Sequence, residues 1–519
     1  MARAEERTVR WWIAALVLAL TAAGLVAVWS GEDQRQEQVL RTMGLVLLTV
    51  LLLLLWVVLL SGLRWRTRGA IVLAFGLLLA LGAALFELRG FSGDLVPRIG
   101  WRFGARAVGP PEVEERRDEW PREQTWRDFP RFLGPRGDGH LPDVALAADW
   151  DATPPVEMWR RTIGEGCSGF AVVGDLAVTQ EQRGEEEYVV AYDLLTGAVR
   201  WAHGRTARHE TAPGGVGPRA TPTIDGGRVF AFGATGILDC LVLETGARLW
   251  THDAVLENGG RVNDWGMSGS PLVVEERVIV SAGGPRGGSL VAYGVADGAL
   301  AWSAGDAPAG YSSPRLVRLR GVEQVLIVNQ GLLVAHDPRS GAILWETPWG
   351  GASMNVADAV VLGDQGVLVS SGYGEGAARF DVRRDEDGTW RANEVWRSRA
   401  LKAKFSNFLV LDGLLFGFDD GILTCVDAAT GERRWKDGRF GHGQLLRVGE
   451  HLLVLGEFGE VLLLAPDPEE LRVLARKKLL DDKTWNSPTL AAPYLLLRND
   501  REAACYRLAA PLVAGEAAR

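Results

Sequence analysis

The 519-residue chain has few of the residues that mark redox, metal and nucleic-acid sites. Its four cysteines form no Cys-x-x-Cys pair, which excludes a haem c attachment site and a dithiol redox motif. The seven histidines lack the His-x-His and His-x-x-x-His spacings of zinc sites, and neither a Gly-x-Ser-x-Gly elbow nor a Walker-type phosphate loop occurs. The net charge is −9 and there is no basic patch or tail, so we expect no nucleic-acid partner.

The N-terminal region is dominated by long apolar runs. Three of them, over 11–29, 43–60 and 70–85, are about long enough to cross a bilayer, and none has a charge at its centre. A cleaved signal peptide would leave the second and third runs unexplained, and no small-residue cleavage pattern precedes them. We therefore expect residues 1–90 to form a three-helix transmembrane anchor. Because no ionisable residue lies inside a span, the helices are expected to anchor the protein and not to form a transport pathway.

The arginines that flank these runs predict their orientation. The first connection, over 31–42, has two arginines and three acidic residues. The N-terminal tail and the second connection are more basic, with Arg3, Arg7, Arg10, Arg64, Arg66 and Arg68. The positive-inside rule therefore places the tail and the second connection in the cytoplasm. Three crossings then put the rest of the chain on the extracytoplasmic side of a bacterial inner membrane, which is the periplasmic side.

Residues 91–150 are rich in charge and proline and predict a juxtamembrane linker. Its last part, Trp126–Gly139, has the sequence WRDFPRFLGPRGDG and combines turn-forming residues with aromatic residues. The aromatic side chains need something to pack against. We therefore expect this segment to lie on the surface of the next domain.

Residues 151–508 contain a sequence repeat. Each copy has an apolar strand, a turn that ends in glycine, and a tryptophan four residues later. The glycine provides the positive φ of a tight turn, and the tryptophan offers a large face to the neighbouring unit. The pairs are Gly197 and Trp201, Gly246 and Trp250, Gly298 and Trp302, Gly341 and Trp345, and Gly431 and Trp435.

The repeat gives units of about 45 residues with four strands each, the pattern of a β-propeller blade. A degenerate unit ending at Trp396 fills the long interval before Gly431, and a unit without tryptophan ends near Val473. The C-terminal strands at 494–497 and 503–508 lack a fourth strand, which a lone strand at 157–161 can supply. We therefore expect an all-β, eight-bladed propeller over 151–508, closed by both ends of the domain so that no sheet edge is exposed, and a tail at 509–519.

The recurring phrase Ala-x-Asp-x-x-Thr-Gly-x-x-x-Trp resembles the pyrroloquinoline-quinone (PQQ) type of β-propeller repeat over roughly residues 155–508. The eight-bladed quinoprotein dehydrogenases share it, as do the BamB-like outer-membrane assembly lipoproteins, which bind no quinone. The chain is also similar to membrane-anchored bacterial PQQ-like repeat proteins in Phe132–Gly139, Gly217–Thr223 and Trp265–Pro271. A fold of this kind does not fix the function.

The resemblance leaves two functions open. The first is a non-catalytic binding or scaffold module, without a cofactor, that offers the channel mouth and blade loops to a protein, peptide or small ligand. The second is a membrane-bound quinoprotein dehydrogenase that holds PQQ with Ca²⁺ and oxidises an alcohol or sugar. Many such alcohol dehydrogenases have an adjacent Cys-Cys pair, which this chain lacks, although membrane glucose dehydrogenases of similar layout lack it too. The blades are also too short for the insertions of those enzymes, which favours the binding module.

Candidate binding residues lie where each unit begins. Polar side chains that precede the innermost strands should ring one mouth of the central channel, where they cap loops or bind a ligand. They are Ser168, Thr221, Ser270, Ser313, Asn355, Asn407, His442 and Ser487. Charged residues near the same openings are further candidates for a binding or acid–base role. They are Glu181, Arg183, Glu210, Arg219, Asp264, Lys404 and Lys483. No residue is assigned a catalytic or metal-binding role.

The cysteines have a structural explanation. Cys240 and Cys425 occupy the repeat position that Ala191 holds in the first unit, and Cys505 is expected at the same position. This position is small and buried, so we expect free thiols in the core. Because the three residues belong to different blades, a disulfide among them is not expected.

Overall fold

The computed structural model describes residues 9–31, 34–104, 108–114, 126–351 and 354–510. These residues form two compact units. The first contains the described residues up to 104 together with 212–214, and the second contains the described residues from 108 onward except 212–214.

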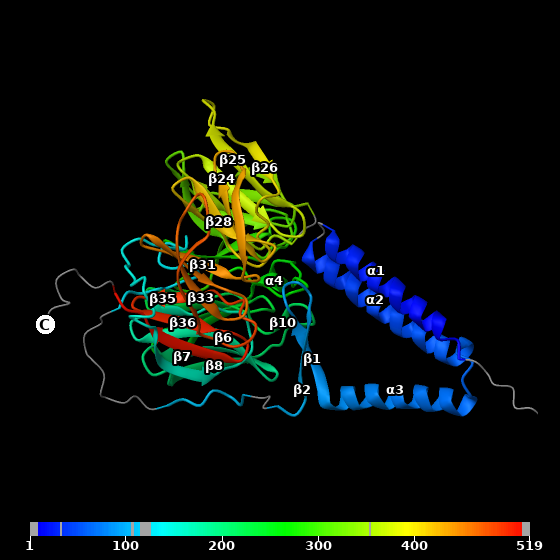
Figure 1. The fold of residues 1–519 in the computed structure, drawn as a ribbon. Coiled ribbons are helices and arrows are strands. Elements are labelled where there is room, and N and C mark those ends of the chain that lie inside the picture. Colours follow the sequence, from blue (N-terminus) through cyan, green and yellow to red (C-terminus); the bar gives the residue numbers. More distant parts are fainter. Residues whose placement is uncertain (1–8, 32–33, 105–107, 115–125, 352–353, 511–519) are drawn as a thin grey trace, which may run out of the picture. The chain divides into compact units, whose positions relative to one another are not determined.

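The first unit is built on three long helices (Figure 1). They are α1 (Trp11–Ser30), α2 (Arg35–Leu55), which continues into a π-helical turn η1 (Trp56–Leu60), and α3 (Trp65–Leu85). All three are long and apolar enough to cross a membrane, as the sequence predicts. Most of their leucine and valine side chains are exposed in the isolated chain, as expected of helices whose natural solvent is lipid.

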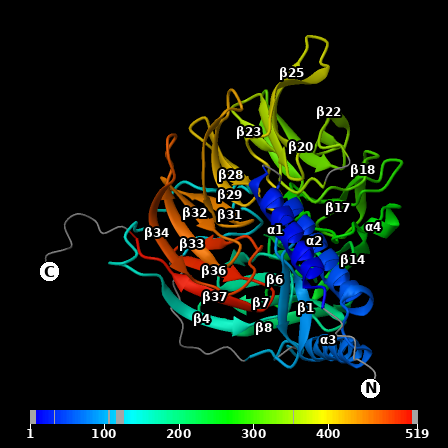
Figure 2. The ribbon, with the colours of Figure 1, turned by 45° about the vertical axis from the view of Figure 1, so that its right-hand side comes forward.

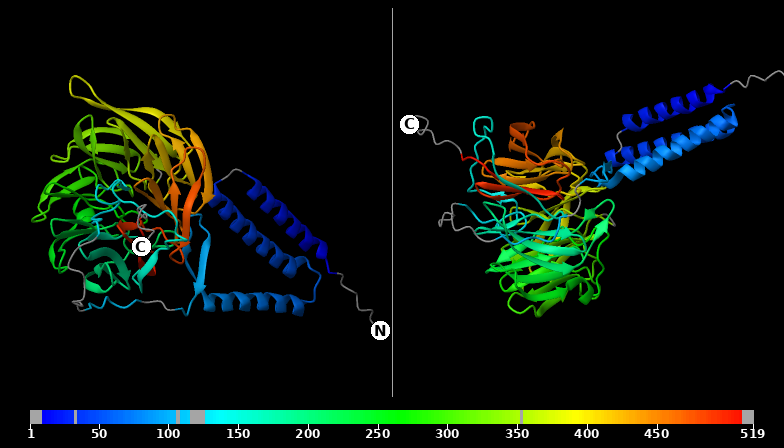
Figure 3. Two further views of the ribbon diagram at one scale, coloured as in Figure 1. Left: turned by 60° about the vertical axis from the view of Figure 1, so that its left-hand side comes forward. Right: turned by 90° about the horizontal axis from the view of Figure 1, so that it is seen from below.

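Helices α1 and α2 pack side by side and antiparallel. The Oγ1 atoms of Thr21 and Thr49 share a hydrogen bond of 2.7 Å in the middle of the pair, and Trp56 Nε1 donates to Arg10 O (3.1 Å) at one end. Hydroxyl groups of this kind are suited to helix contacts in lipid, where no water competes for them. A hairpin of β1 (Phe86–Phe91) and β2 (Pro97–Trp101) follows α3 (Figure 3).

The second unit is a ring of eight antiparallel sheets that follow one another in chain order (Figure 2). The first four blades are β5 (Ala171–Val173), β6 (Leu176–Arg183), β7 (Glu186–Asp193) and β8 (Val199–Thr206); β11 (Thr223–Asp225), β12 (Arg228–Phe232), β13 (Ile237–Val242) and β14 (Arg248–Asp253); β15 (Leu272–Val274), β16 (Arg277–Ser281), β17 (Leu290–Gly294) and β18 (Leu300–Ala304); and β19 (Arg315–Leu319), β20 (Val322–Asn329), β21 (Leu332–His336) and β22 (Ile343–Pro348). A short hairpin of β9 (Glu210–Thr211) and β10 (Gly215–Val216) precedes the second blade, and the one-turn helix α4 (Ala254–Glu257) follows it.

The remaining blades complete the predicted count of eight. They are β23 (Val360–Leu362), β24 (Gly366–Ser371), β25 (Gly376–Arg384) and β26 (Trp390–Ser398); β27 (Leu409–Leu411), β28 (Leu414–Asp419), β29 (Ile422–Asp427) and β30 (Arg433–Arg439); β31 (Gln444–Val448), β32 (His451–Leu455), β33 (Glu460–Ala465) and β34 (Arg472–Lys478); and β35 (Thr489–Ala491), β36 (Tyr494–Arg498), β37 (Glu502–Arg507) and β4 (Val156–Thr162). The degenerate unit ending at Trp396 is blade five, and the unit without tryptophan is blade seven.

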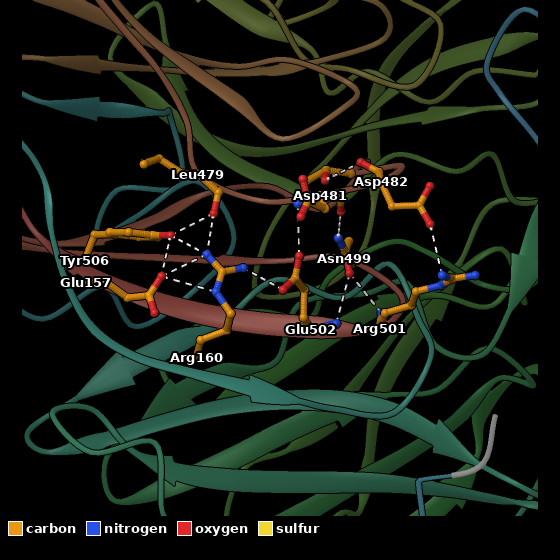
Figure 4. Close-up of polar contacts among 10 residues, drawn as sticks. Glu157, Arg160, Leu479, Asp481, Asp482, Asn499, Arg501, Glu502 and Tyr506 are labelled. Atoms are coloured by element: carbon orange, nitrogen blue, oxygen red, sulfur yellow. Dashed lines mark hydrogen bonds and ion pairs between the residues drawn. The ribbon is translucent and has the colours of Figure 1, made fainter. Parts of the chain in front are cut away.

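The ring closes as the sequence predicts, because β4 from the N-terminal side pairs with β37 from the C-terminal side. A polar network holds this junction (Figure 4). Arg160 donates to Glu157 (2.9 Å), Glu502 (2.5 Å) and Tyr506 Oη (2.5 Å), and also to the carbonyl of Leu479 (2.8 Å). The Arg160 guanidinium on β4 therefore contacts β37 and the connection that follows blade seven.

Neighbouring blades are joined by the repeated glycine and tryptophan. Trp201 pairs with Ala191 in its own blade and lies on Gly246 of the next, where a Cβ atom would stand 2.4 Å from the ring. Gly246 has φ +68°, so both the backbone conformation and the ring contact require glycine. The Trp201 Nε1 atom donates to Leu243 O (2.7 Å). The same ring-on-glycine contact occurs between Trp159 and Gly197, Trp250 and Gly298, Trp302 and Gly341, and Trp396 and Gly431.

The segment that precedes the propeller, which we call the leader (Trp126–Leu141), is more deeply integrated than predicted. It is not confined to the surface of the domain, because Phe129 and Leu133 are buried in the core of blades one, seven and eight. Phe129 forms a bridge with Val172 of β5, and Pro130 O accepts from Ile224 N of β11 (2.8 Å). Its end, β3 (His140–Leu141), pairs with the innermost strand of blade seven. The leader therefore contacts innermost strands from several blades.

The cysteines are free thiols, as expected. Cys240, Cys425 and Cys505 are completely buried and pair with Trp250, Trp435 and Trp159, respectively. Burial raises the pKa of Cys240 and of Cys425 to about 12. These thiols are therefore packing residues and not nucleophiles.

Candidate ligand site at the channel mouth

The polar residues that open the blades form a hydrogen-bonded belt around the channel. Each side chain accepts from the backbone N–H at the equivalent position of the preceding blade. The bonds run from Gly169 N to Thr221 Oγ1 (3.1 Å), Thr221 N to Ser270 Oγ (3.0 Å), Ser270 N to Ser313 Oγ (3.0 Å), Ser313 N to Asp358 Oδ1 (2.7 Å) and Asp358 N to Asn407 Oδ1 (2.7 Å). Thr221, Ser270, Ser313 and Asn407 thus join blades one to six.

Two of the predicted ring residues lie outside this belt. Ser168 comes one residue too early, and its hydroxyl accepts from Gln180 N (3.3 Å). Asn355 comes three residues before the belt member of its blade, Asp358, and its Nδ2 donates to Asn329 O (2.7 Å). The belt residue always lies two positions before the innermost strand, and this constant spacing was the signal that would have selected Asp358 in place of Asn355. His442 and Ser487 keep that spacing in blades seven and eight.

Above the belt, aromatic side chains from different blades meet. Trp265, Phe405 and Trp485 come from loops that lead into β15, β27 and β35, and Tyr373 comes from the loop between β24 and β25. The ring centroids of Trp265 and Phe405 are 5.6 Å apart, although they precede blades three and six. Phe405 also lies 5.0 Å from Trp485 and 6.5 Å from Tyr373. The rings therefore meet over the axis of the propeller.

Two predicted lysines line this group of rings. Lys483 Nζ lies 4.0 Å from the ring centroid of Trp485, and Lys404 Nζ lies 5.0 Å from Tyr373 and 5.2 Å from Phe405. Both side chains belong to residues that are only 4% exposed. Cation–π contacts of this kind stabilise a partly desolvated ammonium group. The ring of Tyr311 also belongs to this group, with its centroid 5.5 Å from that of Trp265. We call Trp265, Tyr311, Tyr373, Phe405 and Trp485, together with Lys404 and Lys483, the mouth cluster.

Arg219 and His442 adjoin the mouth cluster. Arg219 donates to Gly217 O (2.6 Å) and Gly215 O (3.2 Å) in its own loop. The ammonium group of Lys483 approaches the same loop, because a Cβ atom at Gly215 would stand 3.6 Å from its Nζ atom. His442 lies 5.3 Å from Phe405, and its backbone N–H donates to Glu457 Oε2 (3.0 Å). The predicted residues Arg219, Lys404, His442 and Lys483 are thus brought together.

The carboxylate beside the cluster has an anchoring role. Glu457 is 2% exposed, and its Oε1 accepts from Trp485 Nε1 (3.1 Å) while its Oε2 accepts from His442 N. It therefore fixes one ring and one loop of the mouth. Burial raises the pKa of Tyr311 and of Tyr373, so both phenols stay neutral at physiological pH. Tyr311, Phe405 and Trp485 share one repeat position, two residues before Ser313, Asn407 and Ser487, and this spacing could have selected them. Trp265, Tyr373 and Glu457 do not share a repeat position and had no such signal.

The other predicted charged residues are not part of the mouth cluster, although Asp264 is close enough to Tyr311 to raise its pKa. Glu181 is buried in blade one, where it accepts from Arg183 (3.0 Å) and Tyr192 Oη (2.8 Å). Glu210 is exposed and pairs with Arg208 (2.7 Å). Asp264 is exposed, and its backbone oxygen lies 3.2 Å from His209 Nε2. Within the described ranges of the chain, no three His, Cys, Asp or Glu side chains are close enough together to hold a metal ion.

Comparisons with known proteins agree with the fold. The sequence-family model described as outer membrane protein assembly factor BamB matches residues 185–437. The search of curated protein sequences gives no match.

Solved structures show the same propeller in two kinds of protein. BamB from Moraxella catarrhalis is 18% identical, with a TM-score of 0.50 over 68% of this chain and 100% of that chain. A europium-containing methanol dehydrogenase is 12% identical, with a TM-score of 0.53 over 74% and 98% of the two chains. The quinohemoprotein alcohol dehydrogenase from Comamonas testosteroni is 12% identical, with a TM-score of 0.53 over 75% and 81%. The repeat phrase, the eight closed blades and the family match identify this chain as a PQQ-like β-propeller protein.

Proposed function

We propose that the protein is a membrane-anchored binding module whose propeller lies on the periplasmic side of a bacterial inner membrane and binds a partner at the mouth cluster. The three apolar helices and the arginines around them support this location. The observation that carries the proposal is the meeting of rings from distant blades beside two buried lysines.

The chemistry of the mouth cluster favours an acidic segment with an aromatic or apolar residue. Half-buried rings provide apolar contact area at low entropic cost, and aromatic residues are enriched in binding hot spots. The two lysines and Arg219 provide positive charge in surroundings that strengthen its attraction for a carboxylate. The family match to an outer membrane assembly factor supports a protein or peptide as the partner.

The alternative, a PQQ-dependent dehydrogenase, fits these residues poorly. PQQ is a planar acid, and the cations of the cluster suit its carboxylates. Trp265, Tyr373 and Phe405 occupy the space over the axis, with centroids 5.6 to 6.5 Å apart, so no slot for a planar ring is open between them. Glu457 accepts two hydrogen bonds from the protein and is not presented as a base.

A peptide titration tests the proposal. We would mix the full-length protein in detergent with short peptides that combine Asp or Glu with one aromatic residue, and follow tryptophan fluorescence. Saturable binding is expected, and matched peptides with Lys in place of the acidic residues should not bind. Lys404→Met should weaken binding about tenfold, whereas Arg318→Met, an exposed site on β19, should not. Equal binding of acidic and basic peptides, or no binding at all, would overturn the proposal.

A further inference from the structure

A cavity of about 230 Å³ lies between the leader and the innermost strands of blades two, three and four. The leader provides Arg131 and Arg136, and the blades provide Ser270, Ser313 and Arg315. No residue of the mouth cluster lines this cavity. Pro135 and Arg136 are exposed, so the cavity is open to solvent beside them.

The lining contains several hydrogen-bond donors. Arg131 is half-buried, and its Nε atom is buried without a hydrogen-bond partner among the described residues. The hydroxyls of Ser270 and Ser313 each accept a backbone N–H from the belt, and the described part of the chain provides no acceptor for their own protons. A buried donor without a partner costs free energy.

The acidic groups nearby are mostly engaged with other residues. Arg136 pairs with Asp138 (3.0 Å), and Arg315 Nη1 lies 3.6 Å from Asp358 Oδ2, whose other oxygen belongs to the belt. Burial lowers the pKa of Arg131, Asp225 partly offsets this effect, and Arg315 adds to it. Burial also raises the pKa of Asp358 to about 6.

Gly137 brings the two inner arginines to the same place. It has φ +65°, and a Cβ atom there would stand 3.8 Å from Arg131 Cδ and 3.9 Å from Arg315 Nε. The side chains of Arg131 and Arg315 therefore both lie close to Gly137 in the wall of the cavity. A guanidinium binds a carboxylate or phosphate through two parallel N–H bonds.

We propose that this cavity is a binding site for a small oxyanion, a carboxylate or a phosphate group, held by Arg131 with help from Arg315, Ser270 and Ser313. The volume is below that of a site for a drug-sized ligand, which restricts the occupant to a small acid or the acidic end of a larger molecule. The site goes beyond the proposed partner binding, because it lies between the leader and the channel strands and uses different residues.

The test is an anion titration of the full-length protein in detergent at low salt. Inorganic phosphate and succinate are the two probes, succinamide is the neutral control, and binding is measured by calorimetry and by the Tm. Because phosphate also stabilises proteins generally by exclusion from their surface, only the difference between wild type and Arg131→Gln counts. Arg127→Gln is the matched control, since Arg127 lies on the same leader but is exposed.

We expect saturable binding of at least one anion, weakened roughly tenfold or more by Arg131→Gln and unchanged by Arg127→Gln. The tighter probe shows whether the site prefers carboxylate or phosphate. Equal binding by wild type and Arg131→Gln would overturn the proposal, as would wild type that binds neither anion at millimolar concentration. If Arg131→Gln does not fold, the wild-type titration with phosphate and succinate alone tests the proposal.

Discussion

The tryptophans of the outer blade strands and those of the channel mouth belong to the same propeller but have different surroundings. Trp201 is 5% exposed, lies on Gly246, and donates to a backbone carbonyl of the next blade. Trp265 is half-buried in a loop and contacts rings from three other loops. The first environment recurs at five joints between blades, whereas the second occurs where different loops meet. The repeated tryptophans therefore stabilise contacts between blades. The mouth combines aromatic residues at another repeated position, Tyr311, Phe405 and Trp485, with side chains that do not repeat.

Truncation of an outer tryptophan should have the largest effect on stability. Trp201→Ala removes a buried ring that fills the space beside Gly246, together with one hydrogen bond to Leu243 O. We expect the free energy of unfolding to fall by about 3–5 kcal/mol, measured by denaturant unfolding. Trp265→Ala is the comparison, and its cost should be clearly smaller because the ring is only half-buried. Equal losses would contradict the distinction between the two groups.

The belt should respond to loss of a single hydroxyl. Ser313→Ala leaves the buried N–H of Ser270 without its acceptor, at a cost of about 1–3 kcal/mol. Ser340→Ala, in an exposed turn, is the control, because its hydroxyl donates to Asp337 within the same turn. Urea unfolding of both variants measures the difference. A Ser313→Ala protein as stable as wild type would show that this hydrogen bond of the belt does not stabilise the propeller.

The closing junction should be sensitive to acid. Burial pulls the pKa of Glu157 upward, but hydrogen bonds from Arg160 and Tyr506 outweigh this and hold it below its usual value. A carboxyl whose pKa is lowered by folding stabilises the folded state above its unfolded pKa of about 4.3, and this contribution is lost as the pH falls through the folded pKa.

Glu157→Gln should therefore reduce stability at pH 7 by about 1 kcal/mol or less, because the pair is partly exposed. The difference from wild type should shrink as the pH falls below about 4. Thermal unfolding from pH 7 to pH 3 measures it. A difference that stays constant over this range would show that the charge of Glu157 does not contribute to closure.

The smallest effect on stability is expected at the lysines of the mouth. Lys483→Met keeps most of the apolar stem against Trp485 and should change the free energy of unfolding by less than about 1 kcal/mol. The same variant should lose most of its affinity for an acidic peptide that the wild type binds. Affinity is measured by fluorescence and stability by denaturant unfolding. A variant that loses stability and keeps its affinity would show that Lys483 stabilises the fold and does not bind the peptide.

The blade count, the closure of the ring and the three apolar helices could be predicted from the sequence. The glycine–tryptophan phrase recurs often enough to predict eight blades, and the unpaired strands at both ends of the domain predicted the closure through β4 and β37. The hydropathy of the first 90 residues predicted the three helices.

What could not be predicted depends on contacts between loops. Trp265 and Phe405 are 140 positions apart in the sequence, and nothing in their local patterns indicates that they meet. Asp358, in contrast, could have been predicted, because it lies two positions before β23, the spacing that the other belt residues share. The burial of Phe129 and Leu133 was missed because a segment rich in glycine and proline has no periodicity to show which side chains face a core.

Titration of the full-length protein with PQQ distinguishes a binding module from a quinoprotein dehydrogenase. The protein in detergent would be titrated with PQQ and Ca²⁺ by calorimetry, and dye-linked oxidation of alcohols and sugars would be measured in the same samples. We predict no stoichiometric complex at micromolar PQQ and no turnover, because the rings of Trp265, Tyr373 and Phe405 occupy the space over the axis. Stoichiometric binding with turnover would instead show that the protein is a quinoprotein dehydrogenase and not a binding module.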